Sequence, residues 1–358
     1  MFDLLKQWYN NRFSDPDAVT LVFILLFLFA VVLYLGDILA PAIVALVIAY
    51  LLEWPVSQLV KIGVRRSISV AGVLIVFSCI VFTLLIGLTP HIWQQMSNLI
   101  SEIPIILQKG QDYLLNLPPD YQGYINAEQI KNIVDSLKQQ LVDTGKGLVT
   151  ASLNSLVTLV ALLVYLVLVP LLVLFMLLDK DKLLRQMRVI LPRRRRLAIT
   201  VWAEMNQQIG NYIQGKVIEI IIVGTVSVIA FLLLDLRYAV LLGVGVGLSV
   251  LIPYIGAAVI TIPVAVVALF QFGVSPEFWY VMIVYAVIQA IDGNVIVPVL
   301  FSQAVNLHPV FIIIAVLFFG GIWGFWGVFF AIPLATLVKA VVNAWPRVDE
   351  PEEILNKV

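Results

Sequence analysis

The sequence predicts an all-α polytopic membrane protein, because its composition, its run lengths and its charge placement all fit this class. Of its 358 residues, 61% are hydrophobic and 12% are charged, whereas a soluble domain carries about 25% charge. The mean hydropathy is +1.03. Apolar runs are continuous, which excludes a membrane β-barrel with strands that alternate over about ten residues. Several runs approach the roughly 20 residues that a helix needs to cross a bilayer.

Three spans are expected before the first polar region, at Ala18–Leu35, Ile38–Leu52 and Ser67–Thr89. The first is interpreted as a retained span, because no small-residue cleavage site follows a short apolar core. A fourth span is expected at Gly147–Leu178, with Pro170 as a tolerated kink.

The polar insert 90–146 predicts a pair of extramembrane amphipathic helices. Apolar residues recur at helical spacing from Ile92 to Leu107 and from Ile130 to Leu141. Asn126, with Gln129 three residues later, fits a cap at the start of the second helix. The insert either packs on the bundle or a neighbouring subunit, or it gates a substrate path.

Basic residues predict the orientation, since cytoplasmic loops are enriched in Lys and Arg. The loop Asp179–Lys216 and the loop Glu53–Arg66 are basic, whereas the insert has more acids than lysines. Both termini are therefore expected in the cytoplasm and the insert outside. The Arg193–Arg196 run is a topology determinant or a site for anionic lipid.

The C-terminal half predicts a repeat of one span followed by one interrupted segment. The spans are Val217–Leu234 and Phe278–Leu300; the interrupted segments are Tyr238–Phe272, broken at Pro253–Gly256, and Pro309–Val342, broken at Gly320–Gly324. Ile262-Pro263 follows Gly256, and Ile332-Pro333 follows Gly327, at near-equal distances. Re-entrant hairpins here would give the inverted repeat of secondary transporters; the alternative is two ordinary helical hairpins with Pro kinks. The expected units are 1–89, 90–146, 147–178, 179–215, 216–272, 273–342 and the tail 343–358.

Glu219 and Asp292 are the candidate ion-coupling residues. Each interrupts an apolar stretch, where a charge costs at least about 2.5–3.5 kcal/mol and normally faces a protein interior or a wet cavity. Lys216 lies three residues before Glu219 and could pair with it, which would make Glu219 a structural charge. Asp292 could likewise cap a helix or bond to a neighbouring one.

The candidate solute site surrounds Asp292 and the first break. The expected binding residues are Gln214, Pro253, Tyr254, Gly256, Gln289, Gly293 and Asn294, and the expected hinges are Pro263, Pro298, Gly324 and Pro333. Side-chain oxygens and freed carbonyls of a loosened helix can hold Na⁺ or support a proton site. Gly243-x-x-x-Gly247 and Gly320-x-x-x-Gly324 predict close helix packing.

Other functional classes find little support. The net charge of zero gives no field for nucleic acid, and one cysteine allows neither an internal disulfide nor a cysteine metal site. The stretch Gly210–Lys216 has phosphate-loop spacing, but Val217 replaces the expected Ser or Thr and no strand precedes it. Zincin and nucleophile-elbow motifs are absent from the sequence. Neither an enzyme nor a cofactor is expected.

Four segments together resemble the bacterial autoinducer-2 exporter (AI-2E) family: Tyr212–Gly215, Ile252–Gly256, Asp292–Asn294 with Pro298, and Gly320–Gly327. The resemblance implies a bacterial inner-membrane secondary transporter and a homo-oligomer, specifically a pentamer. It also implies that the repeat-containing half moves against a fixed half. Some members resemble exporters of a small furanone-type signal, and others resemble Na⁺/H⁺ antiporters.

The predicted function is export of a small polar solute coupled to H⁺ or Na⁺. The expected partners are membrane lipids, that solute, a monovalent cation and further copies of the chain. The alternatives are a Na⁺/H⁺ antiporter without an organic substrate, a passive channel, and a scaffold for envelope proteins.

Overall fold

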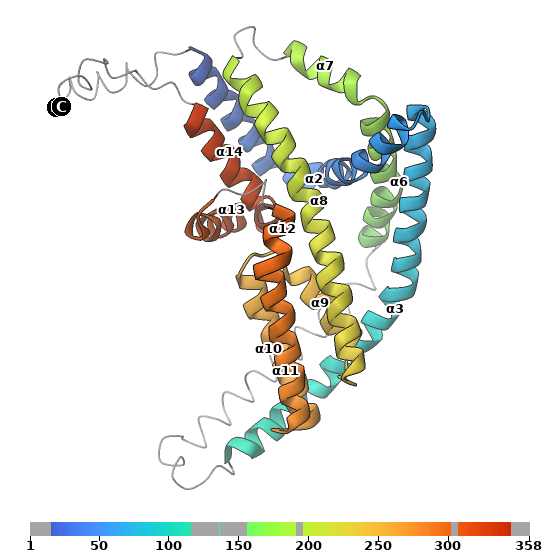
Figure 1. Cartoon of the computed structure of the whole chain (residues 1–358), viewed down its shortest axis with the longest axis vertical. Helices are drawn as coiled ribbons and strands as arrows, with labels where there is room; N and C mark the ends of the chain where they lie inside the picture. The colour runs from blue at the N-terminus through green and yellow to red at the C-terminus, as the bar shows by residue number, and fades with distance from the viewer. Residues whose placement is uncertain (1–15, 116–135, 137–155, 191–195, 302–306, 345–358) are drawn as a thin grey trace, which may run out of the picture.

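The computed structural model describes residues 16–115, 136, 156–190, 196–301 and 307–344, and every regular element in this part of the chain is a helix (Figure 1). The elements are α2 (Pro16–Lys61), α3 (Arg66–Leu115), α6 (Leu156–Leu178), α7 (Lys180–Ile190), α8 (Arg196–Leu233), α9 (Ala239–Ser249), α10 (Ile255–Phe272), α11 (Pro276–Ile291), the π-helix η1 (Asp292–Ile296), α12 (Val297–Phe301), α13 (Pro309–Phe329) and α14 (Ala331–Ala344). Seven helical segments in the described part are long and apolar enough to cross a membrane. The multi-pass fold is thereby confirmed.

Some predictions concern residues outside the described part. These are the second helix of the insert with its Asn126 cap, the first residues of the fourth span, Arg193–Arg195 and the C-terminal tail.

The first two predicted spans are confirmed as the membrane-length segments Val19–Gly36 and Ile38–Lys61, and they lie on one continuous helix, α2. Gly36 serves packing, because a Cβ there would lie 2.7 Å from Nε1 of Trp323 on α13. Figure 1 shows the darker and lighter blue parts of α2 running in different directions. Pro41, inside the helix, removes one intrahelical hydrogen bond and permits such a bend.

The third span continues into the polar insert as one 50-residue helix, α3. The helix continues through Pro90, the first residue of the predicted insert, and through Pro104. Beyond Pro90, Gln95 accepts a hydrogen bond from the backbone N–H of Leu241 at 2.8 Å, and Glu102 lies 3.6 Å from Arg237. The described half of the insert therefore packs against the bundle, one of the two predicted alternatives.

Tyr238, in the turn before α9, joins this contact. Burial, and then the neighbouring carboxylate of Glu102, raises the pKa of Tyr238 to about 12. The phenol therefore keeps its proton at physiological pH and can donate a hydrogen bond to Glu102. Tyr238 provides no side-chain cap for α9, so Gln95 supplies one of the acceptors that this helix start requires.

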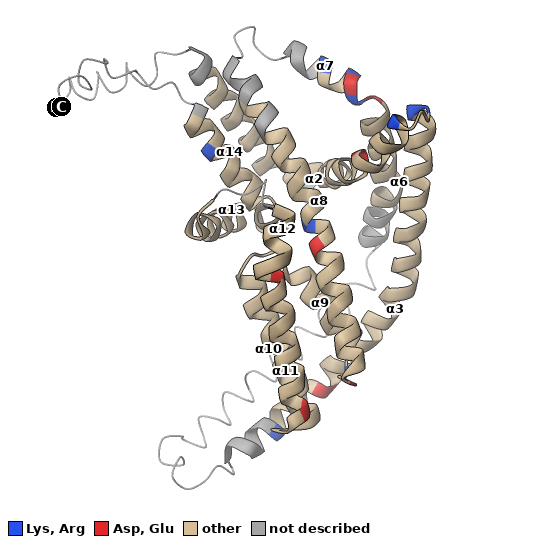
Figure 2. Cartoon of the chain, viewed as in Figure 1, with Lys and Arg blue, Asp and Glu red and all other residues tan. Residues whose placement is uncertain are grey.

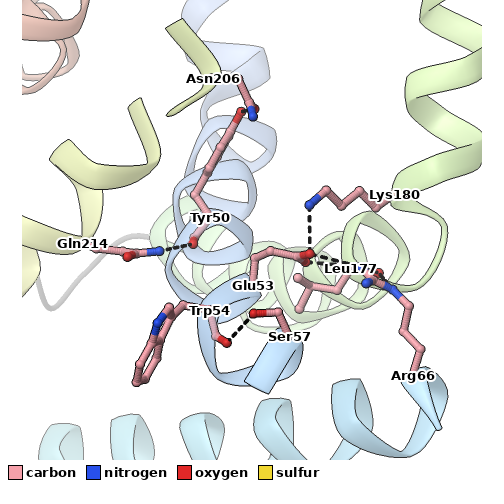
Figure 3. Close-up of polar contacts among 9 residues, drawn as sticks. All are labelled: Tyr50, Glu53, Trp54, Ser57, Arg66, Leu177, Lys180, Asn206 and Gln214. Carbon is pink, nitrogen blue, oxygen red and sulfur yellow. Dashed lines mark hydrogen bonds and ion pairs between the residues drawn. The ribbon is translucent and has the colours of Figure 1, made fainter. Parts of the chain in front are cut away.

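Helices α2, α3, α6 and α7 meet in a polar cluster, here called the polar knot, which consists of Glu53, Arg66, the Leu177 carbonyl and Lys180 (Figure 3). Arg66 donates to the Leu177 carbonyl at the end of α6 from Nε at 3.0 Å and from Nη2 at 2.7 Å. Its Nη2 also lies 3.1 Å from Glu53 on α2. Lys180 of α7 approaches the other Glu53 oxygen at 2.8 Å. A core that includes Val56, Val70 and Val173 lies beside this knot.

Close packing joins α9 to α8 through glycines on both helices. A Cβ on Gly243 would lie 2.5 Å from the Val228 backbone nitrogen, and a Cβ on Gly247 would lie 2.7 Å from the Gly224 Cα. The predicted packing role of Gly243-x-x-x-Gly247 is confirmed.

Helices α9 and α10 form a helical hairpin. With 11 residues, α9 spans about 16 Å at 1.5 Å per residue, about half of the 30 Å hydrocarbon core. Hydrogen bonds join the two ends of the hairpin. Gln271, at the end of α10, donates to the Asp235 carbonyl and accepts from the Arg237 N–H, both at 2.7 Å. The chain therefore leaves the hairpin on the side where it entered.

The second interrupted segment has a turn of the same kind. Gly324 adopts φ 58° and ψ −134° within α13, which breaks the helix there. A Cβ on Gly327 would collide with the Phe319 carbonyl, just as a Cβ on Gly256 would collide with the Ser249 carbonyl. The two glycines thus perform the same task in the two units, as the repeat predicts. The predicted packing role of Gly324 is wrong, because a Cβ added at this position would meet nothing within 4 Å.

Candidate functional site

Three charged side chains are buried where α8 meets the end of α11. Lys216 is 4% exposed, Glu219 is 2% exposed and Asp292 is 8% exposed. Figure 2 shows charge on α8 and at the end of α11 midway along the molecule, while most other charged positions gather toward its two ends. The charges of Lys216 and Glu219 both interact with that of Asp292. The fold therefore brings together the two acids that lie 73 positions apart in sequence.

Lys216 makes three contacts. Its Nζ lies 2.8 Å from Oε2 of Glu219, donates to the Val250 carbonyl at 2.7 Å and sits 5.3 Å from the centroid of the Phe301 ring. The predicted pairing of Lys216 with Glu219 is confirmed. Val250 lies in the break between α9 and α10, so the ammonium also ties α8 to the first hairpin.

Asp292 begins the five-residue π-helix η1. Its backbone carbonyl accepts from the Val297 N–H, the i→i+5 bond of such a helix. Its side-chain Oδ1 is buried and has no hydrogen-bond partner in the described part of the chain. A buried carboxylate oxygen without a partner is costly, which suits a site completed by a proton or a cation.

The amides predicted to bind a solute are engaged within the protein. Gln289 donates to the Tyr285 hydroxyl at 3.0 Å, and Tyr285 in turn donates to the Ala257 carbonyl at 3.0 Å. Asn294 donates to the Ala290 carbonyl at 2.8 Å on its own helix. Tyr285 therefore links α11 to α10, whereas Gln289 bonds within α11 and Asn294 folds back from η1 onto the end of α11.

Gln214 makes a contact of the same internal kind. Its amide donates to the Tyr50 carbonyl at 3.3 Å (Figure 3). The Tyr50 hydroxyl donates to Asn206 at 2.7 Å. Gln214 thus connects α8 to α2 rather than pointing to Asp292.

The backbone residues of the predicted site form the turn of the first hairpin. Pro253 precedes Tyr254, which adopts φ 62°, a value that non-glycine residues seldom take. Tyr254 is 57% exposed, whereas Gly256 is buried beneath the Ser249 carbonyl. Gly293 is exposed, and a Cβ there would meet nothing within 4 Å.

The predicted hinge residues lie in three helices and one break. Pro263 is inside α10, Pro298 is inside α12 and Pro333 is inside α14. Gly324 is the break in α13. The structure fixes their positions, and their movement stays a prediction.

Tyr212 and Phe301 are part of this arrangement, although neither is among the predicted site residues. Tyr212 is 2% exposed and donates from its hydroxyl to the Phe329 carbonyl at 3.0 Å. Phe301 packs against Tyr212 with ring centroids 5.9 Å apart. Tyr212, Lys216 and Glu219 are spaced four and three residues apart, which is the available signal that they share one face of α8.

Comparison with known proteins assigns the chain to a family. Residues 21–347 match the AI-2E family transporter. The chain is 52% identical over 346 residues to "Putative permease PerM" of Escherichia coli K12, covering 97% of this chain and 98% of that protein. It is 24% identical to "Putative transport protein YueF" of Bacillus subtilis, covering 86% and 84%.

A more distant relative carries a substrate in its name. The chain is 23% identical over 313 residues to "AI-2 transport protein TqsA" of Escherichia coli K12, covering 87% of each chain. Because the family model matches most of the length of the chain, the chain belongs to the AI-2E family of transporters.

Proposed function

We propose that the protein is a secondary transporter that exports a small polar solute and couples this export to H⁺ or Na⁺. The observation that carries the proposal is Asp292, a buried carboxylate whose Oδ1 has no partner in the described part of the chain. It lies within electrostatic reach of the Lys216–Glu219 pair. Ionisable groups at membrane depth mark ion and proton paths.

The position of the three charges supports coupling between the ion and the hairpins. Lys216 holds the first break through the Val250 carbonyl, and Tyr212, one turn away, holds the second interrupted segment through the Phe329 carbonyl at the end of α13. A cation or proton that changes the charge at Asp292 alters the field at these attachments. Such a ligand shifts the conformational equilibrium by its difference in affinity for the two states.

The solute is proposed to resemble the autoinducer-2 signal or a related small polar metabolite. Support comes from family membership and from the printed name of one relative, which mentions AI-2 transport. The relatives are named as permeases or transport proteins, which supports a transporter without enzymatic activity.

A Na⁺/H⁺ antiporter without an organic substrate is the second candidate. The observation in its favour is that the amides of Gln214, Gln289 and Asn294 all donate within the protein. Fewer donors are then available to an organic solute, while the Asp292 oxygen still accepts a cation.

The proposed location is the bacterial inner membrane, with both termini in the cytoplasm and the chain assembled as a homo-oligomer. Of the 18 residues in the most apolar stretch of α3, only 6% are buried within the chain. Its apolar face is therefore available to lipid or to another copy.

Purified protein in proteoliposomes tests the proposal. Solute efflux and ion flux are measured under imposed pH and Na⁺ gradients, with autoinducer-2 as the solute probe. Gradient-driven solute flux supports the exporter, and ion exchange without solute flux supports the antiporter. Solute flux that ignores both gradients would indicate a passive channel, and no flux of any kind would favour the scaffold.

A further inference from the structure

We propose that Lys216 is a resident cation that limits the site to one exchangeable monovalent cation, bound at Asp292. This inference rests on the proposed coupling role of Asp292 and adds to it the charge of the ion and the number of ions bound.

The argument begins with the charge balance of the buried cluster. Lys216 contributes one positive charge, whereas Glu219 and Asp292 contribute two negative charges, and all three residues are buried. The cluster therefore carries one net negative charge when all three are ionised. An unbalanced charge in a low-dielectric interior is strongly disfavoured, so one further positive charge completes the site.

The contacts distinguish the two carboxylates. Glu219 is already engaged by the Lys216 ammonium at 2.8 Å. Asp292 has an oxygen without a hydrogen-bond partner in the described structure. The exchangeable ion is therefore assigned to Asp292 rather than to Glu219.

Lys216 is held in place independently of the exchangeable ion. Its ammonium donates to the Val250 carbonyl at 2.7 Å and lies over the Phe301 ring at 5.3 Å. The neighbouring Tyr212 donates a hydrogen bond to the Phe329 carbonyl and, as a neutral phenol, adds no charge. Because Lys216 occupies the place of a second cation, a divalent ion or two monovalent ions would leave the cluster positive.

This charge balance predicts the number of ions bound by a series of variants. Lys216→Met leaves two negative charges, so two monovalent cations or two protons should bind. Glu219→Gln leaves Lys216 to balance Asp292, so none should bind. The double variant Lys216→Met/Glu219→Gln leaves Asp292 alone, so the number should return to one.

The experiment counts ions on the purified full-length chain in detergent. Equilibrium dialysis gives the radioactive Na⁺ bound per chain at alkaline pH, and a pH step to mildly acidic conditions in Na⁺-free buffer gives the protons taken up. Both counts are taken relative to a triple variant that also carries Asp292→Asn. The expected values are one for the wild type, two for Lys216→Met, none for Glu219→Gln and one for the double variant. These values apply to the Na⁺ count if Na⁺ is the coupling ion, and to the proton count if H⁺ is.

A count of one for Lys216→Met, or of one for Glu219→Gln, would overturn the role of Lys216 while leaving Asp292 as a coupling site. A wild-type count of zero in both arms would remove the coupling role as well. If Lys216→Met does not fold, the comparison of Glu219→Gln with the wild type still decides the matter, because the charge balance requires zero against one. A series that holds without solute flux in proteoliposomes would overturn only the solute assignment.

Discussion

Tyr212 and Lys216 lie one turn apart on α8, and each donates a hydrogen bond to a different interrupted segment. The Tyr212 hydroxyl reaches the Phe329 carbonyl at 3.0 Å, and the Lys216 ammonium reaches the Val250 carbonyl at 2.7 Å. One helix face thus attaches both interrupted segments. Glu219 lies on the same face and pairs with Lys216, so the attachments and the charges belong to one continuous arrangement.

The two attachments can be separated by matched substitutions. Tyr212→Phe removes one buried hydroxyl and leaves the Phe329 carbonyl without its donor, at a cost of about 1–3 kcal/mol. Peptide-resolved hydrogen exchange should therefore rise across α13 and α14 and stay unchanged across α9 and α10. Lys216→Met should give the opposite pattern. Equal changes in both hairpins for either variant would contradict separate attachments.

The hairpin turns should be intolerant of any side chain at Gly256 and Gly327. An alanine Cβ would collide with the Ser249 carbonyl at the first position and with the Phe319 carbonyl at the second. We expect Gly256→Ala and Gly327→Ala each to lower the free energy of unfolding by about 1–3 kcal/mol, as for an overpacked core. Thermal unfolding of the purified protein measures the loss.

Gly321→Ala is the matched control for these turns, because its added Cβ would meet nothing within 4 Å and its backbone is helical. The control should keep or slightly raise the melting temperature, since alanine is the better helix former. A melting temperature for Gly256→Ala as high as that of Gly321→Ala would contradict the tight turn.

Several features of this structure are visible in the sequence because they depend on local chemistry. A charge inside an apolar run identifies Glu219 and Asp292, and a spacing of three residues predicts the pairing of Lys216 with Glu219. Glycine and proline mark the breaks near Gly256 and Gly324. The polytopic class follows from run length and composition.

Other features depend on which segments meet, and no local signal reveals them. Gly36 resembles a loop residue, yet it lies within α2 and makes room for Trp323, more than 280 positions away. The partners of Tyr212 and Lys216 are backbone carbonyls, whose identity only the tertiary arrangement decides. The same holds for Gln214, whose amide donates to the Tyr50 carbonyl on α2.

The polar knot around Arg66 should contribute to stability. Arg66 donates to both Glu53 and the Leu177 carbonyl, a geometry that a lysine cannot reproduce with its compact ammonium. We expect Arg66→Lys to lower the free energy of unfolding by about 1–2 kcal/mol, because these hydrogen bonds involve charged groups but are partly exposed to solvent. Arg65→Lys is the control, since the structure gives the Arg65 side chain no ion pair in the described region. Equal melting temperatures for the two variants would remove the knot as a stabilising element.

A re-entrant path of the first hairpin predicts that Asp235 and Glu277 lie on one side of the membrane. In a Cys79→Ser background, cysteines at both positions should react with an impermeant thiol reagent applied to cells with a permeable outer layer. A cysteine at Lys61, an exposed position at the end of α2, should react only after lysis. Reaction of Asp235 and Glu277 cysteines from opposite sides would contradict the contact between Gln271 and the Asp235 carbonyl.

Neutralising Asp292 tests the proposed coupling directly. Asp292→Asn keeps the size of the side chain and its ability to accept a hydrogen bond, but it removes the charge and the exchangeable proton. We expect the variant to insert normally and to lose gradient-driven flux by at least about tenfold, which corresponds to about 1.4 kcal/mol. Asp235→Asn is the matched control: Asp235 lies in the turn after α8 with φ 50°, a backbone conformation that asparagine also tolerates, and its backbone carbonyl contact to Gln271 remains. The control should transport at the wild-type rate in the same proteoliposomes. Full gradient-driven flux through Asp292→Asn would eliminate Asp292 as the coupling residue and shift the assignment to Glu219 or to uncoupled permeation.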